Sequence, residues 1–210
     1  MNTVGLIAIC NMALSHVGVS RFIDDIDEGS NEANICKLFW ESCRDQCLQD
    51  FPWGFAMKYA ELQLLTDTIQ GWAYCYGYPS DCLQARMVIP TITSTDIVNP
   101  KYYKDFLKPV PFKIVSNSDG NKLMIAVNIE TPTLVYTVRI TSYALWSPAF
   151  VNALAYLLAT KICSPLSASP EYATLAGQEY QAALLHAGAL SMNEGKEHEE
   201  PESEFITARR

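Results

Sequence analysis

The sequence predicts an α+β fold: a four-helix bundle of two N-terminal and two C-terminal helices, with an inserted antiparallel β subdomain. Apolar residues recur at helical spacing near both ends of the chain, while β-branched and aromatic residues alternate between turn signals in the middle. Helices from both ends can pack together only if the β segment is an excursion from them. We therefore expect a bundle from residues 1–52 and 147–193, a β subdomain from 53–146, and an extended acidic tail over 194–210.

The first helix is predicted by Leu6, Ile9, Cys10, Ala13, Leu14 and Val17, which fall on one helical face. Gly18 supplies the stop expected just past a helix end. An acidic loop follows, and either Asp27 or Ser30 is placed to cap a second helix that runs to about Asp50. Pro52 ends that helix, because proline disfavours helical geometry in the residue before it.

The middle of the chain reads as strands over 55–65, 71–78, 82–89, 112–115, 122–127 and 133–140. Asp119-Gly120 is typical of a hairpin turn between two of them. The segment 90–111 contains four prolines and few periodic positions, so we expect a long loop there. Loops of this length tend to be functional.

Two further helices are predicted by Ser-Pro start signals at Ser147-Pro148 and Ser169-Pro170. The first, over 149–163, is apolar on nearly every side, which is typical of a helix in the middle of a bundle. The second is long and amphipathic, and it runs to about Leu190. The tail that follows carries six Glu and one Lys between Glu194 and Glu204. It ends in an apolar pair and a cationic pair that we expect to bind a partner: Phe205, Ile206, Arg209 and Arg210.

Composition excludes several classes of protein. The net charge of −8 argues against a protein that grips nucleic acid, because phosphate binding depends on Lys and Arg. Seven cysteines without paired spacing fit a reducing compartment. The N-terminal residues lack signal-peptide features, and no apolar run reaches the roughly 18 residues that span a bilayer. We expect a soluble protein made inside a cell, with no membrane partner.

Metal and calcium sites are not expected. Cys36, Cys43 and Cys47 share a helical face, but structural zinc sites use closer Cys pairs, so these thiols are predicted to pack as small apolar groups. A calcium loop that begins at Asp25 would need its Gly one position after Gly29 and a carboxylate at position 36. The acidic loop is therefore predicted to cap the second helix.

Catalysis has no positive support either. His16, His186 and His198 have no recognisable catalytic motif around them, so we expect no catalytic, cofactor-binding or metal-binding residue. An aromatic set near the first strands could be a base-stacking platform, but it lacks a basic groove; we expect it to pack between the bundle and the β subdomain. The set consists of Trp53, Phe55, Trp72, Tyr74, Tyr76 and Tyr78.

An ordered series of short motifs runs through the chain. Its opening part is Asn11, Ala13, Leu14, Gly18, Arg44, Asp45, Pro52, Trp53, Phe55 and Ala56. Its later part is Trp72, Tyr76, Pro79, Asp81, Tyr136, Phe150 and Leu157. This order resembles the head-to-tail adaptor proteins of short-tailed bacteriophages, of the tail tubular protein A type. The resemblance covers about residues 3–190, except for 90–111.

The resemblance implies a virion structural protein without an active site. Its subunits would form a twelve-membered ring that binds the portal protein above and the tail nozzle below, at the head-tail junction of the virion. DNA would pass through the channel without specific binding. Within such a fold, the junction between bundle and β subdomain would be built from Pro52, Trp53, Phe55, Tyr78, Pro79 and Asp81.

Two other interpretations stay open. A small cytoplasmic α+β enzyme or ligand-binding protein would need a pocket with convergent polar groups. Another tail-completion or head-closure protein of a virion would share the soluble, low-charge composition.

Overall fold

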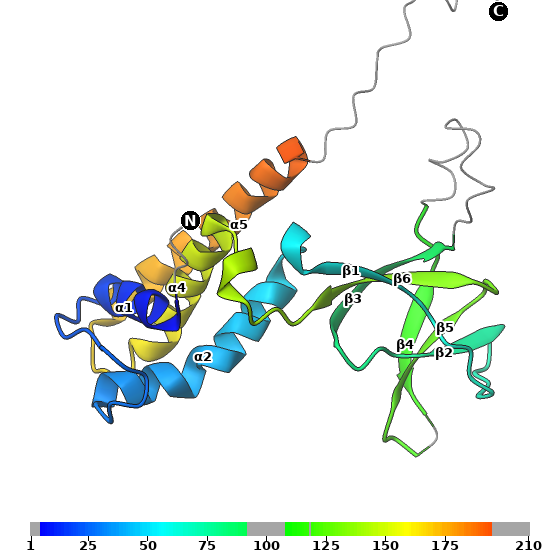
Figure 1. Cartoon of the computed structure of the whole chain (residues 1–210), viewed down its shortest axis with the longest axis horizontal. Helices are drawn as coiled ribbons and strands as arrows, with labels where there is room; N and C mark the ends of the chain where they lie inside the picture. Colours follow the sequence, from blue (N-terminus) through cyan, green and yellow to red (C-terminus); the bar gives the residue numbers. More distant parts are fainter. Residues whose placement is uncertain (1–4, 92–107, 118, 195–210) are drawn as a thin grey trace, which may run out of the picture.

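The computed structural model describes residues 5–91, 108–117 and 119–194, and the side chains of that last range as far as Ser191. Four α-helices and two three-stranded antiparallel sheets make up this described part, so the predicted α+β class is confirmed. The helices occupy one end of an elongated molecule and the strands the other (Figure 1). Below, the helical part is residues 5–52 and 147–194, and the β part is the described residues between them.

Helix boundaries follow the predicted start and stop signals. The helices are α1 (Leu6–His16), α2 (Asn31–Asp50), α4 (Pro148–Ile162) and α5 (Pro170–Glu194). Gly18, just after α1, has a φ of +75°, which favours glycine. Of the two candidate caps for α2, Ser30 is the one used: its hydroxyl accepts a hydrogen bond from the Ala33 amide at 3.2 Å. Ser147 caps α4 in the same way.

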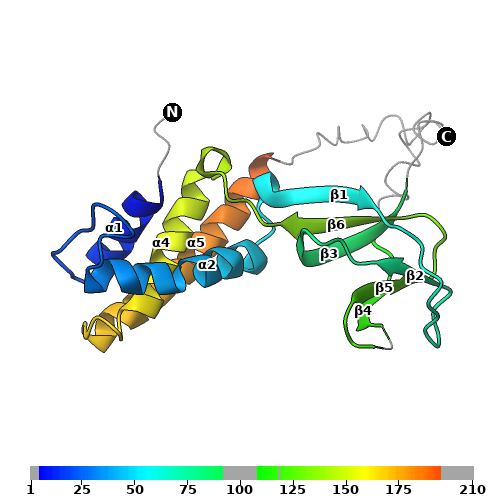
Figure 2. The same cartoon turned by 60° about the horizontal axis from the view of Figure 1, so that its bottom comes forward.

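Helix α4 packs against each of the other three helices (Figure 2). This position explains its composition, because a helix with neighbours on several sides has little need of polar residues. Phe150, Leu154, Leu158 and Ile162 on α4 are fully buried. They form one hydrophobic core with residues of α1, α2 and α5.

The β part contains all six predicted strands: β1 (Met57–Glu61), β2 (Tyr74–Gly77), β3 (Cys82–Pro90), β4 (Phe112–Ser116), β5 (Leu123–Val127) and β6 (Pro132–Val138). They pair in the orders β1-β6-β3 and β2-β5-β4. The first strand is shorter than predicted, because Gly54–Ala56 form a 3-10 turn before it.

Two bridges connect the sheets. Leu64, beyond the end of β1, pairs with Tyr76 on β2, and Val110, before β4, pairs with Val88 on β3. The segment that continues β1 and the segment that precedes β4 therefore each reach from one sheet to the other. The sheets enclose a second core that includes the fully buried Ile125. The β part thus has a core of its own.

The prediction that the aromatic set packs between the two parts is wrong. Trp53 and Phe55 belong to the core of the helical part. Tyr74, Tyr76 and Tyr78 belong to the core of the β part. Trp53 and Phe55 both pack against Phe150 of α4, whereas Tyr74 packs against Tyr76 in the β part, so the set serves two cores.

The turn predicted at Asp119-Gly120 connects β4 and β5, which pair as an antiparallel hairpin. Gly120 has a φ of +69°. The side chain of Asn117 holds this connection: its oxygen accepts hydrogen bonds from the amides of Asn121 and Lys122 at 3.0 and 3.1 Å.

Two predictions fall on residues outside the described ranges. One is most of the predicted 90–111 loop. The other is the set of predicted partner-binding residues in the tail, which are Phe205, Ile206, Arg209 and Arg210.

Candidate functional site

The residues that carry the sequence pattern lie in three places: beside the acidic loop, inside the β part, and where the helical part meets the β part. Trp53, just after Pro52, is only 3% exposed. Its indole nitrogen donates to the Cys47 carbonyl at 2.7 Å. Its ring packs edge-on against the rings of Phe51 and Phe150, with centroids 4.9 and 5.1 Å apart. The chain therefore leaves α2 through a residue that is locked into the helical core.

Arg86 on β3 ties the strands to the C-terminus of α2. Its guanidinium donates to the carbonyls of Leu48, Gln49 and Phe51 at 2.8 to 3.1 Å, and to the Thr137 hydroxyl at 2.8 Å. The last carbonyls of a helix lack partners within the helix. A cation at this point satisfies them, and it also interacts favourably with the negative end of the helix dipole. Burial lowers the pKa of Arg86 from its usual value.

A second link uses Asp45 on α2. Arg44 donates to one oxygen of this carboxylate at 2.9 Å. Arg139, just after β6, donates to both oxygens, at 3.1 and 2.6 Å. Arg44 is buried, and a buried cation of this kind needs a charged partner. The Arg-Asp motif therefore joins α2 to the point where the chain leaves the sheet.

Asp81 works inside the β part. It accepts hydrogen bonds from Lys58 on β1 at 2.6 Å and from the Tyr136 hydroxyl on β6 at 2.9 Å. The Lys58 ammonium, followed by Tyr136, holds the pKa of Asp81 below its usual value. Asp81 therefore fixes the turn between β2 and β3 to the other two strands of the β1-β6-β3 sheet.

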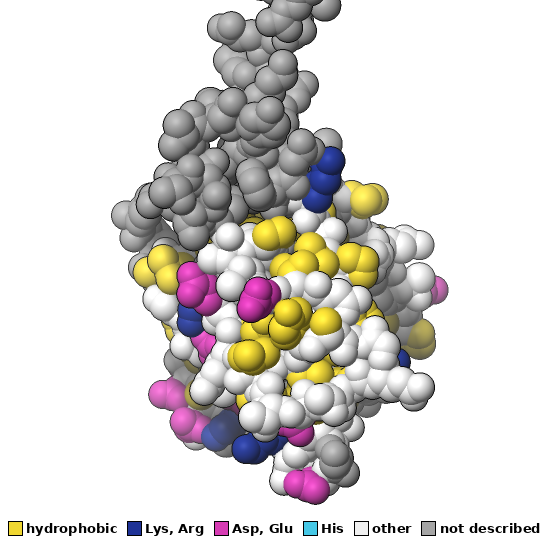
Figure 3. Space-filling view, turned by 90° about the vertical axis from the view of Figure 1, so that its right-hand side faces the viewer, with side chains coloured by type: hydrophobic (Ala, Val, Ile, Leu, Met, Phe, Trp, Pro, Cys, Tyr) yellow, Lys and Arg dark blue, Asp and Glu magenta, His cyan; other side chains and the backbone are white. Residues whose placement is uncertain are grey.

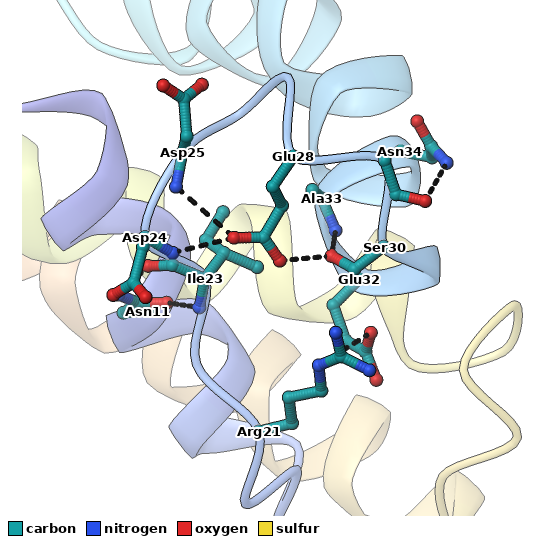
Figure 4. A network of polar contacts seen from close by, with 11 residues as sticks. Asn11, Arg21, Ile23, Asp24, Asp25, Glu28, Ser30, Glu32, Ala33 and Asn34 are labelled. Atoms are coloured by element: carbon teal, nitrogen blue, oxygen red, sulfur yellow. Dashed lines mark hydrogen bonds and ion pairs between the residues drawn. The ribbon is translucent and has the colours of Figure 1, made fainter.

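The acidic loop between α1 and α2 is an internal hydrogen-bond network (Figure 4). Asn11 on α1 makes two hydrogen bonds to the backbone of Ile23, both at 2.9 Å. Glu28 accepts from the amides of Asp24 and Asp25, and from Ser30, the cap of α2. These bonds hold the pKa of Glu28 below its usual value, that from Ser30 most of all. The loop caps α2 as predicted.

The cysteines of α2 pack as apolar groups. Cys36, Cys43 and Cys47 are free and fully buried, and burial raises the pKa of Cys43 to about 11. Within the residues that the structure describes, no group of three or more His, Cys, Asp or Glu side chains could hold a metal ion. His186 is exposed, and His198 lies outside the described residues.

A hollow of about 620 Å³ opens on the β part. Tyr78, Pro79 and Ser80 line one side of it, and Asn117 and Lys122 line another. The junction set predicted from the sequence is therefore divided: Tyr78 and Pro79 line this hollow of the β part, whereas Trp53 lies in the helical core.

Both parts expose large apolar side chains. On α5 these include Leu185, which is 77% exposed, together with Leu175 and Leu190. On the β part they are Tyr59, Leu64, Met87, Ile114, Leu123 and Leu145. Figure 3 shows apolar side chains gathered at the centre of the end formed by the β part, with few charged side chains among them. Exposed apolar patches commonly mark interaction surfaces.

The charge is divided unequally between the two parts. The segments 5–52 and 147–194 contain eleven acidic and four basic residues, whereas 53–146 contain seven acidic and eight basic residues. The helical part is therefore strongly acidic and the β part is close to neutral.

Sequence reasoning did not identify Arg86 or Arg139 as structural links. Their partners lie 35 to 38 and 94 positions away along the chain, so no local spacing points to them. The same is true of the Tyr180 hydroxyl, which donates to Asp50 at 2.6 Å and joins α5 to the end of α2.

No protein-family model matches the chain, and no curated protein matches it. No helix in the described ranges is long and apolar enough to cross a membrane.

Proposed function

We propose that this protein is a head-to-tail adaptor of a short-tailed bacteriophage, a virion structural protein whose ring joins the portal to the tail nozzle. The observation that carries the proposal is the ordered motif series from Asn11 to Leu157. The fold that goes with it is a four-helix bundle with an inserted β subdomain and an extended tail.

The contacts of the motif residues support a structural role. Asn11 fixes the acidic loop, Asp45 binds Arg139, Trp53 is locked into the helical core, and Asp81 holds the start of β3 to β1 and β6. None of these side chains stands as an unpaired polar group in a pocket, as a catalytic residue often does. The pair Asp45–Arg139 keeps the two parts of an elongated subunit in a fixed relation, which a connecting protein requires, and the other three residues each stabilise one part.

The exposed faces suit a ring. A closed ring needs two different contact faces on each subunit, and apolar side chains are exposed on both α5 and the β part. The resemblance implies twelve copies. An acidic helical part that lines the channel would repel DNA phosphates and let the genome pass during ejection without specific binding.

Negative-stain microscopy of the purified protein, mixed with the portal protein encoded by the same genome, tests the proposal. We expect an added ring layer on one end of the portal. A Leu185→Glu variant, which changes an exposed side chain on α5, tests whether that face takes part, and Asn152→Glu, at an exposed position on α4, is its control. Portal particles that stay bare with wild-type protein would contradict the adaptor function.

A second candidate function, a small ligand-binding protein, is favoured by the hollow lined by Tyr78 and Lys122. Its volume of about 620 Å³ lies in the range of small-molecule sites. A thermal-shift screen with a fragment library tests it. A ligand whose effect is lost in Ser80→Trp, which would fill the hollow, would favour this function over the adaptor.

A further inference from the structure

His16, in the last turn of α1, has an unusual environment for a titratable group. Its ring stacks on Tyr156 of α4 with centroids 4.3 Å apart and an interplanar angle of 26°. Its Nε2 atom is shielded from solvent and has no hydrogen-bond partner among the described residues. A hollow of about 250 Å³ lies beside it, lined also by Leu175, Ala176 and Glu179 of α5.

The neutral and charged forms of this ring have different needs. A neutral imidazole can leave one nitrogen without a proton and lie against an aromatic face as a largely apolar group. An imidazolium carries a proton on both nitrogens, so the shielded Nε2 would become a charged donor without a partner. A cation gains from the face of Tyr156, but that gain is smaller than the cost of leaving a buried charged donor unpaired.

Two titratable side chains of the neighbouring helices face His16. They are Tyr156 on α4 and Glu179 on α5, and both line the hollow. Tyr172 of α5 lies against Gly18, two residues further along the chain. Among these described groups only Glu179 is acidic, and its charge favours the protonated ring.

We propose that His16 is an acid-sensitive latch: its neutral ring closes α1 against α4 and α5, and protonation opens the hollow between these helices. Opening admits water to Nε2, or lets the ring turn toward Glu179. This inference does not depend on the adaptor function.

The direction of the pH effect follows from linkage. Burial lowers the pKa of His16 from its usual value of 6.5, while the charge of Glu179 acts in the opposite direction. The unfolded chain therefore binds the proton more readily than the folded one. The stabilisation is fully present above about pH 6.5 and is lost as the pH falls toward the lowered pKa.

Histidine side-chain NMR between pH 8 and 4.5 tests the latch, with the His16 signals assigned from a His16→Asn variant. We expect a titration midpoint for His16 below 6.5, and a still lower midpoint in Glu179→Gln. The matched control is Glu171→Gln, which removes a charge from the same helix outside the hollow and should leave the midpoint in place. A wild-type midpoint at or above 6.5, or no change in Glu179→Gln, would overturn the proposal.

Urea unfolding at pH 7.5 and 5.5 tests the consequence for stability. The unfolding midpoint of the wild type should fall with acidification, and His16→Phe, which keeps the stack but cannot titrate, should lose most of that fall. An equal fall in both proteins would count against the latch, because His186 and His198 are common to both. If the Phe variant does not fold, the NMR titration decides alone.

Discussion

Arg86 makes four hydrogen bonds: three cross the junction to the end of α2, and one goes to Thr137 within its own sheet. Arg86→Met keeps much of the side-chain volume but leaves these carbonyls unsatisfied. We expect a loss of about 1.5–3 kcal/mol in the free energy of unfolding, the usual range for hydrogen bonds to a charged group. Urea denaturation measures it. Lys113→Met, at an exposed position on β4, is the control and should change stability little.

Trp53 is the second residue on which the junction depends. Trp53→Ala should cost roughly 3–5 kcal/mol, because the ring is buried against Phe51 and Phe150. Trp53→Phe, which loses the bond to Cys47 but keeps a ring, should cost less. If Trp53→Ala melts like the wild type but fails to assemble, Trp53 is an interface residue and its structural assignment is wrong.

Among the elements, the β2–β3 turn has a distinct pH dependence. The pKa of Asp81 is lowered by Lys58 and Tyr136, so its contribution to stability is present above its usual pKa of 3.8 and disappears as the pH falls through the lowered value. Asp81→Asn should therefore be less stable than the wild type at pH 7, and the difference should shrink below about pH 4. Unfolding curves at pH 7 and pH 3 test this. A difference of equal size at both values would mean that Asp81 acts without its charge.

The tail after α5 should not contribute to folding. Its Glu-rich composition cannot form a core of its own, because no large apolar residue lies between Gly195 and Ser203. Deletion of residues 195–210 should leave the melting temperature nearly unchanged and weaken attachment to the portal, because the deletion removes Phe205 and Ile206. Unchanged attachment would mean that the tail has no role in assembly.

The helices and strands could be predicted from the sequence, because the signals that start and end them are local. Ser30, Ser147 and Gly18 mark helix ends by their own chemistry, and each strand is bounded by its own turn residues. The pairing of strands and the closure of the two sheets through Leu64 and Val110 depend on residues far apart in the chain. No spacing in the sequence indicates them.

The same distinction holds for the candidate site. Pro52, Trp53 and Asp81 were predicted as structural residues because they sit in recognisable short motifs. Arg86 has no motif around it, and its role appears only when β3 lies beside the end of α2. The hollow beside Pro79 also needs β4 and β5 to come together, so it could not be predicted either.

The whole molecule is elongated, with an acidic helical part at one end and a nearly neutral β part at the other (Figure 1). Each part has its own core, and Arg86 and Asp45 link the two. Such a subunit can present different surfaces to different partners while keeping them in register. The formal charge of −8 opposes self-association at low salt, so we expect the free protein to be monomeric or weakly associated until its template is present.

Sedimentation velocity of the protein at micromolar concentration, alone and with the portal protein of the same genome, tests the adaptor function most directly. We expect a slow, subunit-sized species alone, and co-sedimentation with the portal at a fixed ratio when the two are mixed. A stable large ring without the portal would contradict assembly on a template. Two species that sediment independently at every ratio would contradict the adaptor function itself.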